Sequence, residues 1–481
     1  MQAPELLSPA GSRKHMRYAF AYGADAVYAG QPRYSLRVRN NEFNREEHLA
    51  EAIGEAHRLG KQFYLAVNLS PHNDKLRSFE RDMAPIVDLK PDALIMADPG
   101  LIMMVRDRWP DLPVHLSVQA NAVNWATVKF WHRMGLTRVI LSRELGLEEI
   151  ADIREKVPEM ELETFVHGAL CIAYSGRCLL SGYMNHRDSN QGACTNSCRW
   201  PYQVHDAQET ETGDIVAVRP QVQQAAIAAN GTGLGRWTPA DRTPSEAEET
   251  WDKNALYQRV YLLQQDERPG EYMPAYEDEH GTYIMNSRDL RAVQHVNALT
   301  QMGVHSLKIE GRTKSHYYVA RTAQVYRRAI DDAAAGRAFD MNLMEDLEKM
   351  ASRGFTEGFY RRHLPEEMQY YEGGTSSAGT QQFVGDIVDA DRQRGLLTVQ
   401  VRNRFAKGDA VEIMTPGGNV RLTLDHLENA KDGTRVDVAP GDGWVVRVPL
   451  PENLRDANFE HGLLMREVAP RELPKAAGGC S

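Results

Sequence analysis

The sequence predicts a TIM-type (β/α)8-like barrel of the α/β class, followed by a small antiparallel β-barrel at the carboxyl end. Three observations carry this prediction. Strand-like apolar runs alternate with amphipathic helical segments, nearly every such run stops at a polar residue, and the hydrophobic period changes to two from Gln382 onward. At about 150 residues per domain, the 481 residues suffice for roughly three domains or one large barrel with appendages.

Eight short runs rich in Val, Ile, Leu, Phe and Tyr are the candidate strands of the barrel. They are Glu5–Pro9, Ala26–Gln31, Gln62–Asn68, Ala93–Asp98, Val114–Asn121, Arg138–Glu144, Leu162–His167 and Ser306–Glu310. Segments with apolar residues at i, i+3 and i+4 lie between or after them, such as Arg45–Leu59, Leu76–Leu89, Trp125–Met134, Leu147–Val157 and His316–Ala335. Eight alternating β/α units close into a parallel barrel.

The residues that end these runs predict where the active site lies. The polar strand ends are Ser8, Gln31, Asn68, Asp98, Gln119, Asn121, Arg143, Glu144, His167, Glu310 and Arg312. Taken singly, a polar residue at a strand end marks a turn. In a barrel, however, the carboxyl ends of all strands meet on one face, where loops leave a concave cavity. Together these residues predict a polar mouth.

The remaining chain divides into an excursion, a linker and a second domain. The barrel is expected over residues 1–354, with a cysteine-bearing excursion over 169–302 that exceeds a normal βα loop. Within it, residues 207–250 hold few large apolar side chains and are expected to be flexible, whereas Tyr257–Asn286 returns to a strand-like pattern. A linker (355–381), the small β-barrel (382–470) and a disordered tail (471–481) follow.

The second domain is predicted from period-two alternation. Its candidate strands are Phe383–Val388, Leu396–Val401, Ala410–Met414, Val420–Leu424, Thr434–Val438 and Gly443–Val448, separated by turn signals such as Pro416-Gly-Gly418.

Composition and charge exclude several classes of protein. Apolar residues make up 42% and charged residues 25% of the chain, which is ordinary for a folded, water-soluble protein. The net charge of −10 argues against a broad basic coat, so any nucleic-acid contact must be a local patch. No apolar run reaches the roughly 18 residues of a membrane helix, and Met1–Arg13 lacks the apolar core of a signal peptide. A cytoplasmic protein with no membrane contact is therefore expected.

Four of the five cysteines fall within 28 positions, in the pattern Cys-x6-Cys-x15-Cys-x3-Cys. They are Cys171, Cys178, Cys194 and Cys198. Four thiolates on loops suit either zinc or an iron–sulfur cluster. The Cys-x2-Cys pair that is usual in structural zinc sites does not occur, so the wider spacing favours an iron–sulfur cluster, with zinc and unligated or redox-active thiols as alternatives. Cys480 lies in the tail and is not expected to be a ligand.

Several motifs resemble peptidase family U32, long labelled collagenase-like proteases. They run from Glu5-Leu-Leu-Ser-Pro-Ala-Gly11 and Tyr28-Ala-Gly-Gln31 through His167-Gly-Ala-Leu-Cys171 and Ser175-Gly-Arg-Cys178 to Lys308-Ile-Glu-Gly-Arg312. The resemblance covers essentially the whole chain. Three further segments are similar to a bacterial branch of the family that hydroxylates tRNA, namely Tyr34–Phe43, Ser117–Trp125 and Met285–Leu290.

The resemblance implies a tRNA modification enzyme that forms 5-hydroxyuridine at the wobble position of the anticodon. It implies a prephenate-dependent reaction, the first step towards carboxymethoxyuridine, and an iron–sulfur cluster, expected to be [4Fe-4S], on the four clustered cysteines. Because the fourth ligand varies within the family, Cys198 is the least secure. Relatives that modify ribosomal RNA or hydroxylate quinone precursors leave another substrate as an alternative.

Three groups of residues follow as candidates for the site. The catalytic candidates are His167, Glu310 and Asp98; the substrate-binding candidates are Arg143, Lys308, Arg312, Gln119 and Asn121; and the RNA-binding candidates are Arg33, Tyr34, Arg37 and Arg39. A forked guanidinium suits a dicarboxylate such as prephenate, and arginine with tyrosine suits phosphate contacts and base stacking. For His167, a proton donor, a substrate contact and a hydrogen-bonded core histidine all remain open. Internal Glu310–Arg312 or Arg143–Glu144 pairs are the alternative for the charged residues, and a solvated loop is the alternative for Arg33–Arg39.

A peptidase and a binding module without chemistry are the two other classes of function that the sequence leaves open. A peptidase needs an activated nucleophile or a metal-bound water, and the sequence has neither a His-Glu-x-x-His helix nor a Gly-x-Ser-x-Gly elbow. The run Glu277-Asp-Glu-His280 offers metal-binding groups but is more typical of a solvated turn. A binding module without chemistry would lack the clustered thiols and polar strand ends. The sequence makes no prediction about the oligomeric state.

Overall fold

The structure is a computed structural model that describes residues 2–36, 41–170, 177, 289–311, 314–350, 354–361 and 379–468, together with the backbone of four strands between residues 202 and 276. Contacts divide the chain into two units. The first comprises residues 1–195, 288–368 and 376–481, and the second comprises residues 196–287 and 369–375. None of the described helices is both long enough and apolar enough to span a bilayer.

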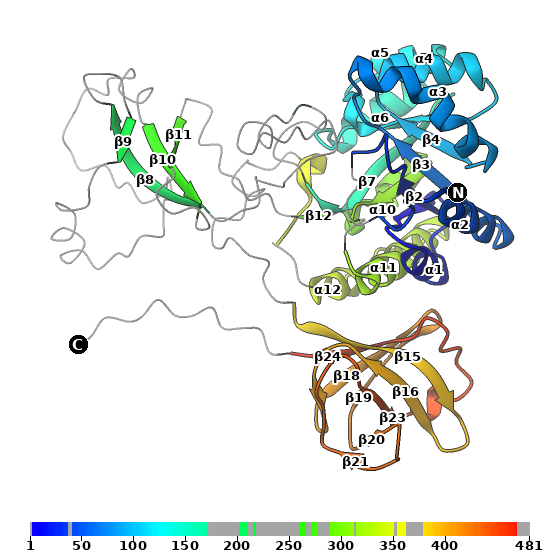
Figure 1. Cartoon of the computed structure of the whole chain (residues 1–481), viewed down its shortest axis with the longest axis vertical. Coiled ribbons are helices and arrows are strands. Elements are labelled where there is room, and N and C mark those ends of the chain that lie inside the picture. Colours follow the sequence, from blue (N-terminus) through cyan, green and yellow to red (C-terminus); the bar gives the residue numbers. More distant parts are fainter. Residues whose placement is uncertain are drawn as a thin grey trace. The chain divides into compact units, whose positions relative to one another are not determined.

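The first unit contains a closed barrel of eight parallel strands (Figure 1). The strands are β1 (Glu5–Pro9), β2 (Ala26–Gly30), β3 (Gln62–Val67), β4 (Ala93–Met96), β5 (Val114–Leu116), β6 (Arg138–Ile140), β7 (Glu161–Ala169) and β13 (Ser306–Ile309). Each strand pairs with the next in this order, and β13 pairs with both β1 and β7, which closes the barrel. The predicted (β/α)8-like barrel is therefore confirmed, with its eight strands where the apolar runs predicted them.

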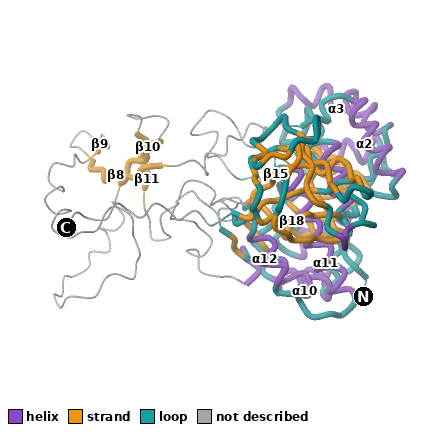
Figure 2. Tube along the Cα trace, turned by 90° about the horizontal axis from the view of Figure 1, so that it is seen from below, coloured by secondary structure: helices purple, strands orange, loops and turns teal. Residues whose placement is uncertain are grey.

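Helices follow the strands and cover the outside of the barrel; in Figure 2, α2, α3, α10, α11 and α12 lie towards the edge of the first unit. They are α1 (Arg13–Ala21), α2 (Glu46–Arg58), α3 (Asn73–Asp88), α4 (Pro99–Arg108), α5 (Trp125–Arg133), α6 (Leu147–Lys156), α10 (Val296–Gln301), α11 (His316–Ala334) and α12 (Asn342–Glu348). Several begin at polar caps that accept a backbone N–H, including Ser12, Asn124 and Ser315.

The carboxyl end of β7 carries an additional strand pair. There β7 pairs antiparallel with β12 (Asp289–Arg291), which in turn pairs with β14 (Phe355–Thr356). Barrel packing continues to residue 361, because Tyr360 is buried and its hydroxyl donates to the Phe165 carbonyl at 2.6 Å. The linker predicted to begin at residue 355 thus begins later, because this segment adds a strand to the barrel sheet instead of leaving it.

Residues 379–468 form an antiparallel sheet in the order β19-β18-β24-β15-β16-β23-β20-β21. Its strands are β15 (Gln381–Asp391), β16 (Leu396–Val401), β18 (Ala410–Thr415), β19 (Gly418–Thr423), β20 (Leu427–Asn429), β21 (Arg435–Val436), β23 (Val445–Pro449) and β24 (Leu463–Glu467), with a separate pair β17 (Phe405–Ala406) and β22 (Val438–Ala439). The antiparallel domain predicted by the period-two pattern is present, and within residues 379–468 no ladder joins the outer strands β19 and β21.

This sheet packs on helices α1 and α11 of the barrel within the same unit. Met414, Leu463 and Met465 join the apolar core of the barrel. The fully buried guanidinium of Arg321 on α11 donates to the buried carboxylate of Glu412 on β18. The sheet keeps an apolar core of its own, and three of its residues and a buried ion pair join it to the barrel.

The second unit contains a four-stranded antiparallel sheet in the order β11-β10-β8-β9. Its strands are β8 (Tyr202–Glu209), β9 (Ile215–Ala217), β10 (Val260–Gln265) and β11 (Tyr272–Tyr276). Strands β10 and β11 lie where a strand-like pattern was predicted. The end of β8 (residues 207–209) and strand β9 both lie inside the segment 207–250 that was predicted to be flexible, and they pair with each other. The rest of that segment and the tail 471–481 lie outside the described residues.

Candidate active site at the mouth of the barrel

The carboxyl ends of the eight parallel strands meet at one mouth, as the sequence predicted. His167 and Glu310, at the ends of β7 and β13, are directly joined, because the Glu310 amide donates to the His167 carbonyl at 2.8 Å. Gln31, Asn68, Asp98 and the residues after β5 and β6 follow the ends of their strands in the same way. The mouth therefore gathers side chains that are far apart in the sequence.

An ion pair between Arg143 and Glu310 spans the mouth above β7. Arg143 Nη2 lies 3.1 Å from Glu310 Oε2, and both side chains are largely buried. Arg143 Nη1 donates to the Ala169 carbonyl at 3.1 Å, and the guanidinium stacks 3.8 Å from the centre of the Phe165 ring. The ion-pair alternatives considered from the sequence joined neighbouring residues, whereas the structure pairs the charges across strands. Glu144 instead accepts a hydrogen bond from Ser142.

Two glycines and a tyrosine hold the end of β13 in place. Gly311 has φ +144°, and a Cβ there would lie 2.6 Å from the Tyr318 ring. Gly168 has φ +104°, and a Cβ there would lie 2.3 Å from the Glu310 carbonyl oxygen. The Tyr318 hydroxyl donates to that same carbonyl at 2.8 Å. Sequence reasoning missed Tyr318; the glycines beside His167 and Glu310 were the available signal of close backbone approach.

His167 is a buried, neutral side chain. It is 1% exposed, and its ring contacts the rings of Tyr318, Tyr326 and Phe355 at 5.5–5.7 Å between centroids. Burial, reinforced by the charges of Arg291 and Lys314, lowers the pKa of His167 to about 3. An imidazole with this pKa is not in its imidazolium form at neutral pH, so it cannot act as an imidazolium acid. Of the three roles open for His167, the structure favours the core histidine over the proton donor.

Lys308 lies inside the barrel, below the mouth. Its Nζ donates to Glu163 at 2.7 Å and lies 4.4 Å from the centre of the Tyr28 ring. Burial lowers the pKa of Lys308, and the carboxylate of Glu163 opposes that shift. Glu163 also contacts Arg138, which binds Glu5 at 2.6 Å. The prediction that Lys308 binds a substrate does not fit this position, because its ammonium belongs to the buried charge network of the barrel interior.

Amide and hydroxyl groups form the opposite side of the mouth. Asn68 Nδ2 donates to Ser117 Oγ at 3.3 Å, and Asn121, in the left-handed region with φ 52°, donates to the Gln119 carbonyl at 3.5 Å. Both Gln119 and Asn121 are half-buried at the rim. Asp98 has a local role, since its Oδ1 caps α4 by accepting the Leu101 amide at 3.0 Å.

The predicted RNA-binding segment follows β2. Arg33 is half-exposed and binds Asp82 at 2.5 Å. Tyr34 is fully buried, with its hydroxyl 2.8 Å from Asp82 and its ring packed edge-on against Phe79. The prediction that Tyr34 contacts RNA does not fit this burial, because its ring faces are already covered.

Seven predicted site residues lie outside the described residues. They are Arg37, Arg39, Arg312, Cys171, Cys178, Cys194 and Cys198; the Glu277–His280 run lies outside them too. Within the described part of the chain, no cluster of His, Cys, Asp or Glu suits a metal ion. The donor chemistry of four clustered thiolates fits an iron–sulfur cluster. The first of them follows Ala169, the residue bound by Arg143, by two positions.

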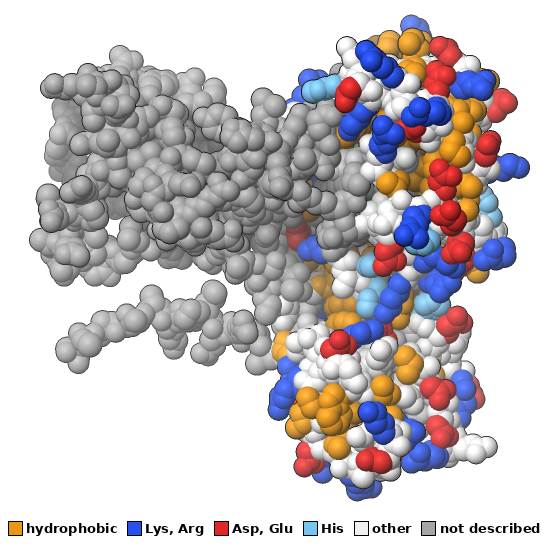
Figure 3. Space-filling model, viewed as in Figure 1, with side chains coloured by type: hydrophobic (Ala, Val, Ile, Leu, Met, Phe, Trp, Pro, Cys, Tyr) orange, Lys and Arg blue, Asp and Glu red, His pale blue; other side chains and the backbone are white. Residues whose placement is uncertain are grey.

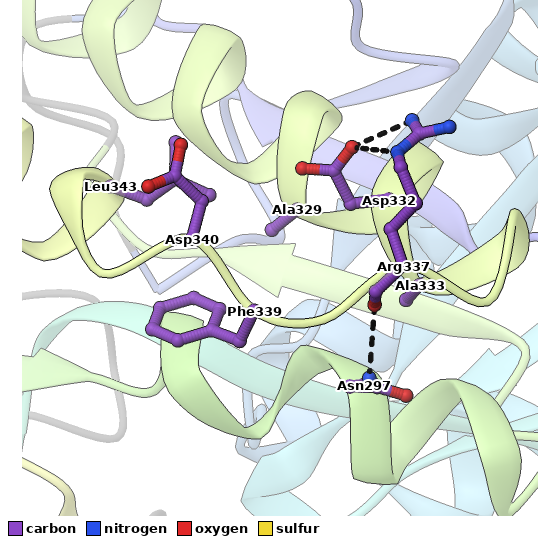
Figure 4. A pocket seen from close by; sticks show the side chains of 8 residues that line it. All are labelled: Asn297, Ala329, Asp332, Ala333, Arg337, Phe339, Asp340 and Leu343. Atoms are coloured by element: carbon purple, nitrogen blue, oxygen red, sulfur yellow. Dashed lines mark hydrogen bonds and ion pairs between the residues drawn. The ribbon is translucent and has the colours of Figure 1, made fainter.

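A pocket away from the mouth has a structural explanation. It lies between α10, α12 and the carboxyl end of α11 (Figure 4). Because α11 follows β13 and returns along the outside of the barrel, its carboxyl end lies on the side of the amino ends of the strands. Its polar groups satisfy one another: Arg337 Nε donates to Asp332 at 2.7 Å, and Asn297 donates to the Arg337 carbonyl at 3.5 Å. This pocket therefore does not compete with the mouth as the candidate site.

Comparisons with known proteins agree with this architecture. Residues 11–370 match peptidase family U32, and residues 379–466 match the C-terminal domain of that family. The "tRNA hydroxylation protein P" of Escherichia coli (strain K12) is 60% identical over 469 residues, which is 98% of each chain. The protein of that name from Haemophilus influenzae is 58% identical, over 97% of this chain and 96% of the relative. The "tRNA hydroxylation protein P1" of Bacillus subtilis (strain 168) is 33% identical, over 95% of this chain and 94% of the relative. The chain therefore belongs to peptidase family U32.

Proposed function

We propose that this protein is an enzyme that hydroxylates tRNA. The observation that carries the proposal is 60% identity over 98% of both chains to a relative named for tRNA hydroxylation. That match covers the barrel, the excursion and the C-terminal sheet together. The polar mouth of the barrel supports an enzyme in preference to a binding module, because it combines a buried cross-strand ion pair with amide side chains.

The proposed substrate position is the wobble uridine of the anticodon, and the proposed product is 5-hydroxyuridine, the first step towards carboxymethoxyuridine. The product carries an oxygen atom on C5 of the base, so the enzyme must reach the edge of the ring. Anticodon-loop bases are single-stranded and can be splayed out of the stack. A recessed mouth with amide groups on one side fits recognition of such a base by edge hydrogen bonds.

Prephenate is the proposed required metabolite. It is a dicarboxylate, and a guanidinium binds a carboxylate through two parallel hydrogen bonds. Arg143 is the described candidate for this contact, since Glu310 and Ala169 together occupy two of its five N–H donors. Arg312 is the second candidate, two residues beyond Glu310. In this proposal Glu310 positions Arg143, and the substrate carboxylate binds to its remaining donors.

The proposed cofactor is an iron–sulfur cluster held by Cys171, Cys178, Cys194 and Cys198. Such a cluster supplies one-electron chemistry or an iron site that binds substrate oxygen atoms. The segment that bears the four thiols starts where β7 ends, and Arg143 holds the last carbonyl of that strand. Arg143 would thus both bind prephenate and fix the start of the segment that holds the cluster.

The function is tested by gene deletion and complementation. In a host that also lacks any oxygen-dependent route to the same modification, deletion is expected to abolish 5-hydroxyuridine in tRNA digests analysed by mass spectrometry. The wild-type gene restores it only when the host makes prephenate. Unchanged wobble-uridine hydroxylation in the deletion strain would refute the proposal, and hydroxylation of ribosomal RNA instead would identify the alternative substrate.

The cofactor is tested with two cysteine variants. Protein purified without oxygen is expected to be brown, with a broad charge-transfer absorption and stoichiometric iron and sulfide. Cys171→Ser should lose the colour and the iron, whereas Cys480→Ser, in the tail, should retain both. Colourless wild-type protein that carries one zinc ion would decide for the zinc alternative.

A further inference from the structure

A cleft of about 310 Å³ lies between α2 and α3, next to the carboxyl end of β2. Three arginines from three separate elements line it. Arg33 comes from the loop after β2, Arg45 directly precedes α2, and Arg81 lies on α3. The face of the molecule in Figure 3 mixes basic and acidic side chains without one broad basic surface. A local gathering of arginines is therefore the form that RNA contact must take in a chain of net charge −10.

A single carboxylate holds two of these arginines in place. Arg33 Nη1 donates to Asp82 Oδ2 at 2.5 Å, and Arg81 Nη2 donates to Asp82 Oδ1 at 3.1 Å. Burial would raise the pKa of Asp82, but hydrogen bonds from Tyr34, Ser78 and Arg81 lower it, so the carboxylate stays ionised. The two arginine side chains are 54% and 77% exposed. Each guanidinium therefore keeps N–H donors that face solvent.

Arg45 is the third positive group of the cleft. It is exposed, and no ion pair or side-chain hydrogen bond involves it in the part of the chain that the structure describes. Together the three arginines outnumber the two carboxylates that line the cleft, Asp82 and Glu46, so the cleft keeps a positive charge. Arginine is the side chain best suited to phosphate, because its planar fork matches two phosphate oxygens.

The floor of the cleft is apolar. Pro32, Phe43 and Pro85 contribute to it, and Phe43 is 1% exposed. A bare phosphate gains nothing from such a floor and fills only a small part of the volume. A nucleotide matches both features, since its phosphate meets the arginine rim while its sugar or base packs on Pro32 and Pro85, which are partly exposed.

The position of the cleft relates it to the mouth. Gln31 lines the cleft at the carboxyl end of β2, and its Oε1 accepts the amides of Arg33 and Tyr34 at 2.6 Å each. When a base is inserted into the mouth, the nucleotides on either side of it must lie across the rim of the barrel. We propose that the cleft formed by Arg33, Arg45 and Arg81 binds the phosphate backbone of the tRNA nucleotides that flank the target base. This inference rests on the proposed function, and it adds two arginines and a cleft that the sequence did not indicate.

The test measures binding of a fluorescent anticodon stem–loop RNA by anisotropy. Arg45→Gln and Arg81→Gln are each expected to weaken binding about threefold, as for an exposed ion pair. Each should also reduce the slope of log K against log salt by about 0.7–0.9. Arg45→Lys, which keeps the charge, should retain most of the affinity. Arg58→Gln is the control, because Arg58 is an exposed arginine at the far end of α2, about 20 Å along the helix.

Two outcomes would overturn the proposal. Unchanged affinity and salt slope in the Arg45→Gln/Arg81→Gln double variant would exclude a phosphate contact at the cleft. Inorganic phosphate and unlabelled RNA can each be added as competitors of the fluorescent RNA, at the same total concentration of phosphate groups. If both displace it equally well, the cleft is a small-anion site instead. Hydroxylation by the wild-type protein is measured separately in the complementation assay. The two assays are therefore independent. The protein can fail to hydroxylate tRNA while the cleft still binds RNA, or it can hydroxylate tRNA although the cleft does not bind RNA.

Discussion

The buried pair Arg321–Glu412 should hold the C-terminal sheet on the barrel. The Arg321 side chain is 0% exposed and that of Glu412 is 2% exposed. Gln381 Nε2 also donates to Glu412 at 2.9 Å, and Lys349 Nζ lies 3.6 Å away. Removal of Arg321 would leave a buried carboxylate that has lost its principal partner. The perturbation is Arg321→Met, which keeps most of the side-chain volume.

The expected magnitude follows from these contacts. Breaking a buried ion pair by removing one partner costs about 3–5 kcal/mol of unfolding free energy. The lower end, about 3 kcal/mol, is expected because Lys349 and Gln381 still face Glu412. The double variant Arg321→Met/Glu412→Leu leaves no unpaired buried carboxylate, although Gln381 Nε2 loses its acceptor, so it should be more stable than the single variant.

Urea denaturation followed by circular dichroism measures both values, and acidification provides a second readout. Burial raises the pKa of Glu412, but Arg321 and Gln381 lower it further, so the net shift is downward. The pair therefore stabilises the protein above the unfolded-state pKa of about 4.3, and this contribution is lost as the pH falls through the lower folded-state value. The double variant should lack this part of the acid sensitivity. A loss below about 1 kcal/mol for Arg321→Met, or a double variant less stable than the single one, would refute the reasoning.

Three further predictions concern the mouth. The pKa of His167 is about 3 in the folded protein. As the pH falls below about 6.5, His167 therefore takes up a proton in the unfolded protein but not in the folded one, and the folded state loses stability. His167→Gln should reduce the stability that is lost between about pH 6.5 and 3, as measured by denaturation at several pH values. Gly168→Ala should destabilise the fold by at least about 1–3 kcal/mol, since its φ is +104° and its Cβ would meet the Glu310 carbonyl. Gly60→Ala, with a φ of +66° and open space around the new Cβ, should cost only about 1 kcal/mol in the same thermal denaturation assay. Arg143→Lys keeps a charge beside Glu310 but loses the fork, so 5-hydroxyuridine in tRNA should fall at least about tenfold while stem–loop affinity stays unchanged; full modification would place the carboxylate contact elsewhere.

The sequence predicted the barrel because its signals are local. Apolar runs, helical periodicity and polar strand ends all lie within short windows, so each of the eight strands can be placed from the sequence alone. The partner of Arg143 could not be placed in this way. Neighbouring residues were the natural candidates, but the strand order β6-β7-β13 brings Glu310 across from another part of the chain.

The burial of side chains near the strand ends could not be predicted from local sequence patterns either. Lys308 and Tyr34 lie within a few residues of the mouth, yet one points at Glu163 and the other at Asp82. Whether a residue there faces solvent depends on partners from β7 and α3, which the sequence pattern does not identify. The cleft with Arg45 and Arg81 went unnoticed for the same reason, because its arginines come from three elements.

The antiparallel pairing of β7 with β12 makes the structure of the barrel independent of how long the excursion between these two strands is. Ala169 pairs with Asp289 and His167 with Arg291, so the chain leaves and re-enters the barrel at adjacent backbone positions. Each doubling of the chain between two fixed ends adds only about 0.6 kcal/mol of closure entropy. Insertions or deletions within residues 196–287, which belong to the second unit, should therefore leave the folding of the barrel nearly unaffected. The mouth can thus acquire new appendages during evolution without being rebuilt.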